Sequence, residues 1–375
     1  MNILFWCEGF LPRVGGIEIL VSQLAKTLVG RGHACEIITN RHAPDLPAND
    51  THHGAVVHRL DFAEAVRSRS PREMHQLCQQ VRVIRQRFRP AVNHVFLSGP
   101  LVVLMQMTNR TPAIPIVTSL QTPTSGVLSG GSVVKRLLRE SSFVAAANES
   151  LKQAVIDLVP ETRSRTHRMP HSVLAPGITP SPLPIEPPVL LCLGRLAAEK
   201  GFDVALRALS QLDERWREVR MIITGDGEER SRLEALSRKL GQAKRVHFTG
   251  AIANQDVAAM LNKATLVLVP SRWQEPFPII CLEAGMMARP VVASRVGGVP
   301  ELVEDGETGL LVEPEEPEAL ARSIETLLGN HERMRAMGER AKRRVVERFG
   351  FEAYAVKHLE WYSAAAAPSP GFGLS

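Results

Sequence analysis

The sequence predicts an α/β fold of two Rossmann-like domains, each built on a parallel sheet. The chain has 375 residues, more than one hydrophobic core usually organises. Apolar runs of four to seven residues alternate with longer segments of helical period, the pattern of parallel strands joined by crossover helices. A proline-rich segment near the middle divides this pattern into two halves.

The apolar runs predict six strands in each half. In the first half they are Asn2–Cys7, Cys35–Thr39, Val56–Leu60, Val92–Leu97, Ile114–Ser119 and Phe143–Ala147. Helices there are expected to begin near Gly16, Arg72, Pro100, Ser132 and Glu149. In the second half the predicted strands are Val189–Leu193, Arg220–Thr224, Val246–Thr249, Leu266–Val269, Val291–Ala293 and Gly309–Val312.

Six prolines between Ala175 and Pro188 remove backbone donors, so neither a helix nor a strand is expected there. We therefore expect an N-terminal domain over residues 1–172, a linker over 173–188 and a C-terminal domain over 189–350. A charged helix is predicted at His331–Phe349. A further helix, about 351–363, is expected to pack back on the first domain, and residues 364–375 to form a disordered tail.

The composition is that of an ordinary globular protein, with 44% hydrophobic and 22% charged residues. No run approaches the roughly 20 apolar residues that span a bilayer. The first residues read directly as a strand, so we expect no signal peptide. The five cysteines are an odd number without CxxC spacing, which favours a reduced, cytoplasmic compartment.

The positive charge is concentrated in the first half. Residues 1–170 contain 20 Lys and Arg against 12 Asp and Glu, whereas the remainder has 25 against 27. Seven arginines from Arg67 to Arg89 face one acid, Glu73. With Lys135, Arg136 and Arg139, they lie among apolar residues that could face a lipid surface, namely Val81, Val83, Ile84, Phe88, Val133, Val134, Leu137 and Leu138. This mixture predicts attachment to the anionic inner face of a membrane. The alternative is that they only form a solvated surface or bind an acidic soluble acceptor. We expect no nucleic-acid partner.

The first motif, Gly15-Gly16-Ile17-Glu18, lies between the first strand and an amphipathic helix. Glycines let a ligand approach the backbone, and free amides at a helix start favour a phosphate. Two glycines at such a turn can equally be needed for steric reasons alone.

The second motif runs from Gly194 through Arg195 and Lys200 to Gly201, after a predicted strand. It places two cations at the carboxyl edge of a parallel sheet, where ligands bind. Arg195 can hold a phosphate in a bidentate manner and Lys200 can add a point charge, so both could stabilise a diphosphate leaving group. The alternative is a surface ion pair with Glu199.

The third motif contains Glu275 and Glu283, eight positions apart around Pro278. Proline suits a first helical turn, so Glu275 is expected in a loop and Glu283 in a helix. A carboxylate can accept two hydroxyl hydrogens, which suits a ribose for Glu283 and sugar hydroxyls for Glu275. The loop amides could hold a phosphate.

Two further loops are expected at the same edge, Thr224–Glu228 and Val296–Glu301. The whole series, in the order Gly-Gly-x-Glu, Gly-Arg-Leu-x-x-Glu-Lys-Gly, Glu-x7-Glu and Gly-Gly-x-Pro-Glu, resembles the family 4 glycosyltransferases of GT-B fold. Pro270-Ser271 and Asp305–Gly309 add to it. The resemblance covers nearly the whole chain and is most specific in the second half.

The resemblance implies a retaining glycosyltransferase that needs neither metal nor cofactor. Its donor would be a nucleoside-diphosphate sugar, first of all a UDP-sugar, with guanosine and adenosine as alternatives. Its acceptor would be a hydroxyl of a glycan, a lipid-linked sugar or a small molecule. The domain of residues 1–172 would bind the acceptor, and the domain of residues 189–350 would bind the donor. The catalytic residues would be Arg195, Lys200 and Glu275. The donor-binding residues would be Gly16, Gly194, Arg195, Lys200, Glu275, Phe277, Pro278, Ile279 and Glu283.

Two positions depart from the family pattern. Gln121 stands where relatives commonly have a histidine, and His171-Ser172 replaces a common Asn-Gly. Glutamine can hydrogen-bond a sugar but cannot carry a proton as imidazole does. His94 and His171 are candidates for the crevice, although a lone histidine is more often structural. A nucleotide-sugar-binding protein with little catalysis, or an epimerase or phosphorylase of the same fold, are the alternative functions.

Overall fold

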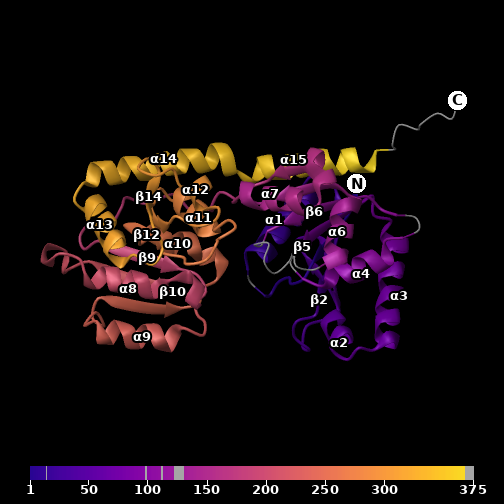
Figure 1. Cartoon of the computed structure of the whole chain (residues 1–375), viewed down its shortest axis with the longest axis horizontal. Helices are drawn as coiled ribbons and strands as arrows, with labels where there is room; N and C mark the ends of the chain where they lie inside the picture. The colour runs from indigo at the N-terminus through magenta and orange to yellow at the C-terminus, as the bar shows by residue number, and fades with distance from the viewer. Residues whose placement is uncertain (14, 98, 111–112, 122–130, 368–375) are drawn as a thin grey trace. The chain divides into compact units, whose positions relative to one another are not determined.

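The computed structural model describes residues 1–13, 15–97, 99–110, 113–121 and 131–367. The chain folds into two compact units, each with helices packed around a mainly parallel sheet (Figure 1). The N-terminal unit comprises Met1–His171 together with the chain from Glu352 onward. The C-terminal unit comprises Ser172–Phe351.

The N-terminal unit is built on an eight-stranded sheet of order β3-β4-β2-β1-β5-β6-β7-β8. Its strands are β1 (Asn2–Cys7), β2 (Ala34–Asn40), β3 (Asn49–His52), β4 (Ala55–Leu60), β5 (Val92–Leu97), β6 (Ile116–Leu120), β7 (Ser141–Ala146) and β8 (Thr166–Arg168). All neighbours pair in parallel except β3 and β4, which are antiparallel. Its helical elements are α1 (Gly16–Gly30), α2 (Phe62–Arg67), α3 (Pro71–Phe88), α4 (Leu101–Thr108), α6 (Gly131–Glu140), α7 (Glu149–Leu158), the 3-10 helix η1 (Pro160–Arg165) and α15 (Phe351–Ala366).

The C-terminal unit has a six-stranded parallel sheet of order β11-β10-β9-β12-β13-β14. Its strands are β9 (Val189–Leu193), β10 (Arg220–Thr224), β11 (Val246–Gly250), β12 (Leu266–Val269), β13 (Val291–Ser294) and β14 (Gly309–Val312). Its α-helices are α8 (Phe202–Ser210), α9 (Arg230–Lys239), α10 (Val257–Asn262), α11 (Ile279–Met286), α12 (Val299–Leu302), α13 (Pro317–Leu328) and α14 (His331–Phe349). Three short 3-10 helices complete it: η2 (Ala198–Lys200), η3 (Glu214–Trp216) and η4 (Asn254–Asp256).

The predicted fold class is confirmed, and all twelve predicted strands form with limits that shift by at most two residues. Strands β3 and β8 and the short helix α2 were not predicted. β3 is the polar segment Asn49–His52 at a sheet edge, and β8 has only three residues, so neither gives an apolar run. The expected start of the tail is wrong, because α15 continues through Ala366. Alanines at 364–366 favour helix, and residues 368–375 lie outside the described residues.

Local signals explain where the long helices begin. Ser70 accepts a hydrogen bond from the Glu73 backbone amide at the start of α3, and Pro71 occupies the first turn, which satisfies one of the free amides of a helix start. Asn330 caps α14 in the same way, through the amide of Arg333. These caps fix the starts of the two longest helices that the structure describes.

Helix α15 packs on the N-terminal unit through aromatic side chains. Trp361 stacks on Phe143 of β7 with ring centroids 5.4 Å apart. The hydroxyl of Tyr362 lies 2.6 Å from Nδ1 of His94, whose Nε2 lies 2.8 Å from Oγ of Ser119. His94 is fully buried, and burial holds its pKa well below the ordinary value. His94 is therefore a neutral core residue and not a crevice residue.

The proline-rich segment forms no regular helix or strand and belongs to the C-terminal unit. Arg289 holds it, donating to the backbone oxygen of Ser181 at 2.9 Å. Asn262 adds a second anchor by accepting from the Ser181 amide at 2.9 Å. The segment is thus packed on its unit through hydrogen bonds rather than through a ladder.

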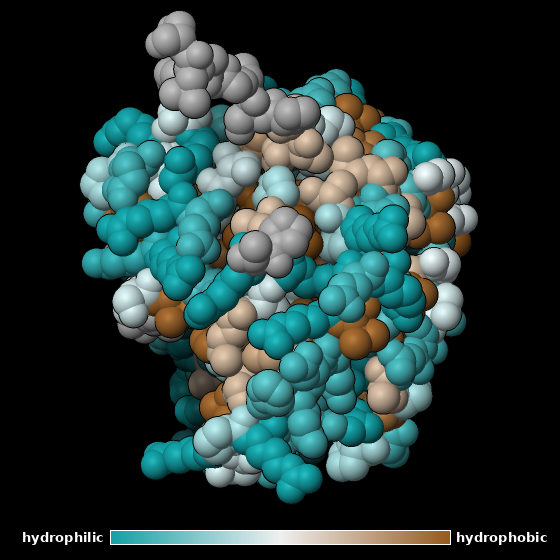
Figure 2. Space-filling view, turned by 90° about the vertical axis from the view of Figure 1, so that its right-hand side faces the viewer, coloured by the Kyte–Doolittle hydropathy of each residue, from teal (hydrophilic) through white to brown (hydrophobic). Residues whose placement is uncertain are grey.

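The apolar residues expected to face a membrane mostly face the core instead. Val81, Ile84, Val134, Leu137 and Leu138 are buried, Phe88 and Val133 pack against the same cluster, and only Val83 is exposed, at 62%. The amphipathic faces of α3 and α6 are therefore used for packing inside the unit. The face shown in Figure 2 is accordingly largely hydrophilic, with small separate apolar areas.

Candidate functional site

Four loops of the C-terminal unit carry the sequence motifs, and each follows the carboxyl end of a strand. They follow β9, β10, β12 and β13, which are neighbours in the sheet. Since parallel strands end at the same edge, the four loops gather where ligands bind in such folds. The structure therefore brings Gly194, Arg195, Lys200, Glu275 and Glu283 to one region of one unit.

Glycines allow these loops to touch through their backbones. Gly201 has a positive φ of 66°, and a side chain there would collide with the backbone oxygen of Pro270. Gly297 has a φ of 52°, and a side chain there would collide with the backbone oxygen of Glu275. Gly298 donates to that same oxygen at 2.7 Å. Only glycine suits both the conformation and the approach.

Lys200 and Glu275 form the central ion pair of the site. Nζ of Lys200 lies 2.6 Å from Oε1 of Glu275, which also accepts from the Ser271 hydroxyl at 2.8 Å. The Glu275 side chain is 5% exposed and that of Lys200 is 25% exposed. A buried carboxylate needs such partners, so this pair fixes two loops to each other and leaves the ammonium partly open to a ligand.

Arg195 lies at the edge of this region and is 61% exposed. It forms an ion pair with Glu199 and lies 3.8 Å from Glu228. In the structure, Arg195 thus forms the surface ion pair with Glu199 that is the alternative interpretation of the motif. Exposed pairs of this kind are weak, so a bound diphosphate could displace Glu199.

Glu283 lies on α11 and is half-buried. Within the described residues its carboxylate has no hydrogen-bond or ion-pair partner. Burial raises its pKa to about 7. A half-buried carboxylate without donors is ready to accept hydroxyl hydrogens from a ligand.

Phe277, Pro278 and Ile279 occupy the start of α11. Pro278 is the residue before the first helical position, so its expected place inside the first turn is off by one. The Phe277 side chain is buried and contacts Phe349, with ring centroids 5.9 Å apart. Phe277 can therefore offer a ligand its backbone only, whereas Ile279 is half-buried.

Two residues that the sequence did not single out belong to the same region. Arg272 holds Asp203 at the start of α8 through two hydrogen bonds of 2.7 Å and also pairs with Glu315. Burial alone would raise the pKa of Asp203, but Arg272 outweighs it and lowers that pKa. Arg272 also donates to the backbone oxygen of Ala198 at 2.9 Å, so it braces the loop that carries Lys200.

Trp273 is the second missed residue. Its ring lies under Lys200, with Nζ 5.8 Å from the centroid. Its Nε1 is buried and has no acceptor among the residues that the structure describes. No local pattern marks Arg272 or Trp273, because Asp203 lies 69 positions from Arg272 and Lys200 lies 73 positions from Trp273, and only the fold joins them.

Three of the predicted residues, Gly16, Gln121 and His171, belong to the N-terminal unit. Gly16 is exposed at the start of α1, directly after the extended Gly15. Gln121 and His171, the two departures from the family pattern, contact each other through Oε1 and Nε2, and both are buried. Burial lowers the pKa of His171 to about 4, so this imidazole is neutral at pH 7. The His171 imidazole therefore lies beside the Gln121 amide as a second neutral hydrogen-bonding group.

Within the described parts of the chain, no three His, Cys, Asp or Glu side chains are grouped closely enough to hold a metal ion. In the same parts, no helix is both sufficiently long and sufficiently apolar to cross a membrane.

Comparison with known proteins gives matches over most of the chain. The family model "Glycosyltransferase Family 4" matches residues 14–173, and the model "Glycosyl transferases group 1" matches residues 179–344. The alpha-D-kanosaminyltransferase of Streptomyces kanamyceticus is 39% identical over 41% of this chain and 40% of that protein. The D-inositol 3-phosphate glycosyltransferase of Nocardia farcinica is 29% identical over 94% of this chain and 85% of that protein.

Two solved structures show the same fold. Sucrose-phosphate synthase from Thermosynechococcus elongatus superposes with a TM-score of 0.81 at 21% identity, covering 97% of this chain and 98% of that chain. HepE of Anabaena, in complex with UDP and glucose, has a TM-score of 0.79 at 22% identity, covering 97% and 100%. The resemblance seen in the motifs is thus confirmed: the chain belongs to the family 4 glycosyltransferases and has the GT-B fold.

Proposed function

We propose that this glycosyltransferase transfers a sugar from a UDP-sugar to an acceptor hydroxyl with retention of configuration, without a metal ion or cofactor. The observation that carries the proposal is the free carboxylate of Glu283 in the loop region that holds the Lys200–Glu275 pair. The Glu283 carboxylate can accept hydrogens from the hydroxyls of a ligand, and the Lys200 ammonium can hold a diphosphate.

In the proposed complex, Glu283 accepts hydrogens from the ribose hydroxyls. Lys200 and Arg195 stabilise the charge that grows on the diphosphate as the glycosidic bond breaks. Glu275 hydrogen-bonds the sugar, and amides of the loop from Phe277 to Ile279 hold a phosphate at the start of α11. The Gly194 and Gly16 backbones complete the donor contacts.

The leaving diphosphate would take the proton of the acceptor hydroxyl, which attacks from the same face. This step needs no strong general base in the protein. A neutral pair of Gln121 and His171 is compatible with it, because amide and imidazole can both hydrogen-bond a sugar without accepting its proton. Uridine is proposed as the base because the related HepE structure contains UDP.

The acceptor is proposed to be a glycan, a lipid-linked sugar or a small molecule. Binding of nucleotide sugar with little transfer is the second candidate, and the buried Gln121–His171 contact is the observation in its favour. An epimerase or phosphorylase of GT-B fold would require a different residue set. Release of UDP from a panel of UDP-sugars, with and without acceptors, would distinguish transfer from binding alone.

We further propose a cytoplasmic protein that associates with the anionic inner face of a membrane through charge alone. Three of the seven arginines already have partners in the protein: Arg67 pairs with Glu64, Arg87 with Glu36, and Arg85 donates to Thr108. Arg69, Arg72, Arg82 and Arg89 form no ion pair with any residue in the described parts of the chain. These four, with Lys135 on α6, are the cations left for a surface.

Removal of the Glu283 carboxylate should weaken UDP binding. In Glu283→Ala, the loss of a charge-assisted hydrogen bond should cost about 1.5–3 kcal/mol, or roughly 10- to 100-fold in Kd. Lys200→Ala should weaken binding similarly but also lower Tm, because Glu275 is then buried without its cation. Calorimetric titration with UDP measures the first effect. The exposed carboxylate of Glu332, on α14, gives the control Glu332→Ala, and equal affinity in Glu283→Ala and the control would refute the assignment.

Transfer should persist in the presence of a strong chelator. The cations proposed for the leaving group are Arg195 and Lys200, and they need no divalent ion beside them. UDP release is measured with excess EDTA and after adding Mg²⁺ or Mn²⁺. Activity that is lost in EDTA and restored by either ion would contradict the proposal.

The stability of the protein should depend on pH through the titration of Glu283. Its pKa of about 7 in the folded protein lies above the ordinary value of 4.5. The favourable contribution of Glu283 to the free energy of unfolding is therefore present below pH 4.5 and is lost as the pH rises through 7. Glu283→Gln removes this loss and should stabilise the ligand-free protein by about 1–3 kcal/mol at pH 8, with little change at pH 5. Urea unfolding at both pH values measures it. The same difference at pH 5 and pH 8 would show that Glu283 does not titrate in this range.

Membrane attachment should depend on salt. Each basic residue near an anionic surface contributes about 1 kcal/mol, so vesicles with anionic lipid should sediment the protein at low salt and release it at high salt. The variant Arg69→Ser, Arg72→Ser, Arg82→Ser, Arg89→Ser should abolish this sedimentation. Equal and negligible binding to anionic and neutral vesicles would exclude the membrane role.

A further inference from the structure

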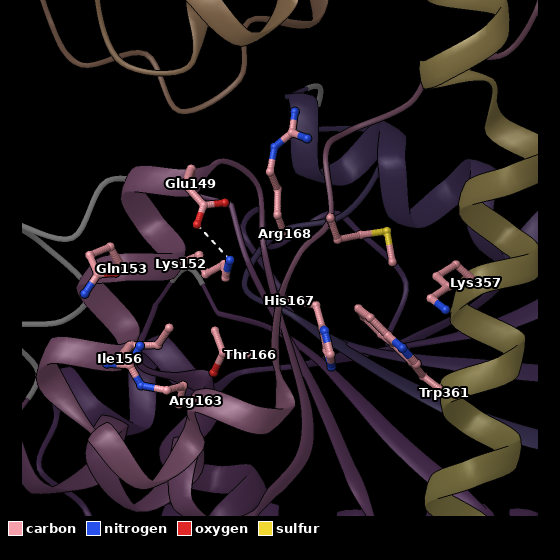
Figure 3. A pocket seen from close by; sticks show the side chains of 11 residues that line it. Glu149, Lys152, Gln153, Ile156, Arg163, Thr166, His167, Arg168, Lys357 and Trp361 are labelled. Atoms are coloured by element: carbon pink, nitrogen blue, oxygen red, sulfur yellow. Dashed lines mark hydrogen bonds and ion pairs between the residues drawn. The ribbon is translucent and has the colours of Figure 1, made fainter.

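The N-terminal unit contains a pocket of about 660 Å³ that none of the sequence motifs explains. Figure 3 shows it between α7 and α15, with strand β8 and the 3-10 helix η1 completing its wall. Strand β8 is an edge strand of the eight-stranded sheet. The pocket thus lies beside the sheet rather than at the β1–α1 turn that carries Gly16.

The lining of the pocket is strongly cationic. Lys152, Arg163, Arg168 and Lys357 line it, whereas Glu149 is the one acid in its lining. Lys152 pairs with Glu149 at 2.7 Å, and Lys357 pairs with Glu360 at 2.8 Å, each pair within one helix. The Lys152 side chain is 30% exposed and that of Lys357 is 52% exposed. Such pairs contribute little, so both ammonium groups can turn to a ligand.

Arg163 is the cation of the pocket lining whose side chain is most available to a ligand. It lies on η1 and is exposed, and it forms no ion pair or hydrogen bond with any residue that the structure describes. Its guanidinium can hold a phosphate, sulfate or carboxylate group in a bidentate manner.

The charges of two lysines of the lining act on the same residue, His167. Its pKa is lowered first by burial and then by the charges of Lys357 and Lys152. These two lysines come from α15 and α7, far apart in the sequence, yet both repel a proton on the same imidazole. Cations from two helices therefore lie around one residue of the lining.

Two aromatic rings, those of Trp361 and His167, belong to the lining of the pocket. Trp361 is 4% exposed and is fixed by stacking on Phe143, and the His167 ring lies 5.3 Å from it. Thr166 and Gln153 add hydroxyl and amide groups to the lining. Aromatic groups beside a few polar groups are typical of small-ligand pockets, and the hydroxyls and apolar carbons of a sugar ring fit such a lining.

We propose that this pocket binds an anionic sugar, one that carries phosphate, sulfate or carboxylate groups, at a site separate from the nucleotide. Four strand spacings separate β8 from β1, or about 19 Å, so the occupant does not compete with a ligand at Gly16. None of the exposed large apolar side chains in the described chain lines the pocket. This hollow therefore suits a soluble charged sugar better than a lipid surface. The proposal goes beyond the transfer reaction and does not depend on the donor residues.

The test uses the full chain and calorimetric titration with a sulfated heparin oligosaccharide and its desulfated form. The sulfated form should bind and the desulfated form should not. Arg163→Ala and Lys357→Ala should each weaken binding about tenfold, while UDP affinity and Tm stay unchanged. Arg82→Ala removes an exposed arginine of α3 in the same unit, outside the pocket, and should bind as the wild type does.

Other results would overturn the proposal. Equal losses in Arg82→Ala and Arg163→Ala would show attraction to the net charge of the unit alone. Inorganic pyrophosphate bound as tightly as the oligosaccharide would exclude a role for the sugar ring. Binding of anionic vesicles that is lost in Arg163→Ala, without binding of the oligosaccharide, would assign the pocket to a lipid headgroup. Displacement of the oligosaccharide by UDP would place both in one site.

Discussion

The proposed donor region depends on one buried carboxylate and the cation that neutralises it. Glu275 is held between Lys200 and Ser271, and its backbone oxygen receives the Gly298 amide. Three loops from three strands thus converge on one residue. Without the ammonium, a buried charge would remain, at a cost of several kcal/mol. The same ammonium is the proposed partner of the diphosphate, so the pair couples the order of the loops to the occupancy of the site.

A second layer supports this pair. Arg272 ties Asp203 and the Ala198 carbonyl to the loop after β12, so the segment that carries Lys200 is held at both ends. Precise placement matters for a clamp on a developing charge, since small displacements of the donors weaken it. Arg272 contacts no predicted site residue through its side chain in the described structure, yet it determines where Lys200 can lie.

Most of the fold could be predicted from the sequence because buried parallel strands form continuous apolar runs. Where a strand is polar and at an edge, as β3 is, that signal is missing. The motif loops could be located because each follows such a strand. The Asp203–Arg272 and Gln121–His171 contacts could not, since they join residues 69 and 50 positions apart that carry no shared pattern. The mixture of cations and apolar residues in α3 and α6 was predicted to face a membrane, but such a pattern does not tell whether a core or a membrane covers the apolar residues.

The discontinuity of the N-terminal unit affects the order in which the protein can fold. Its sheet is complete at β8, but α15 follows the entire C-terminal unit in the chain. During synthesis, the C-terminal unit therefore emerges whole before the first unit receives the helix that covers His94 and Phe143. Until then, the His94 imidazole and an aromatic surface of the nascent unit face water. Helix α15 therefore acts as a late closing element of the N-terminal unit.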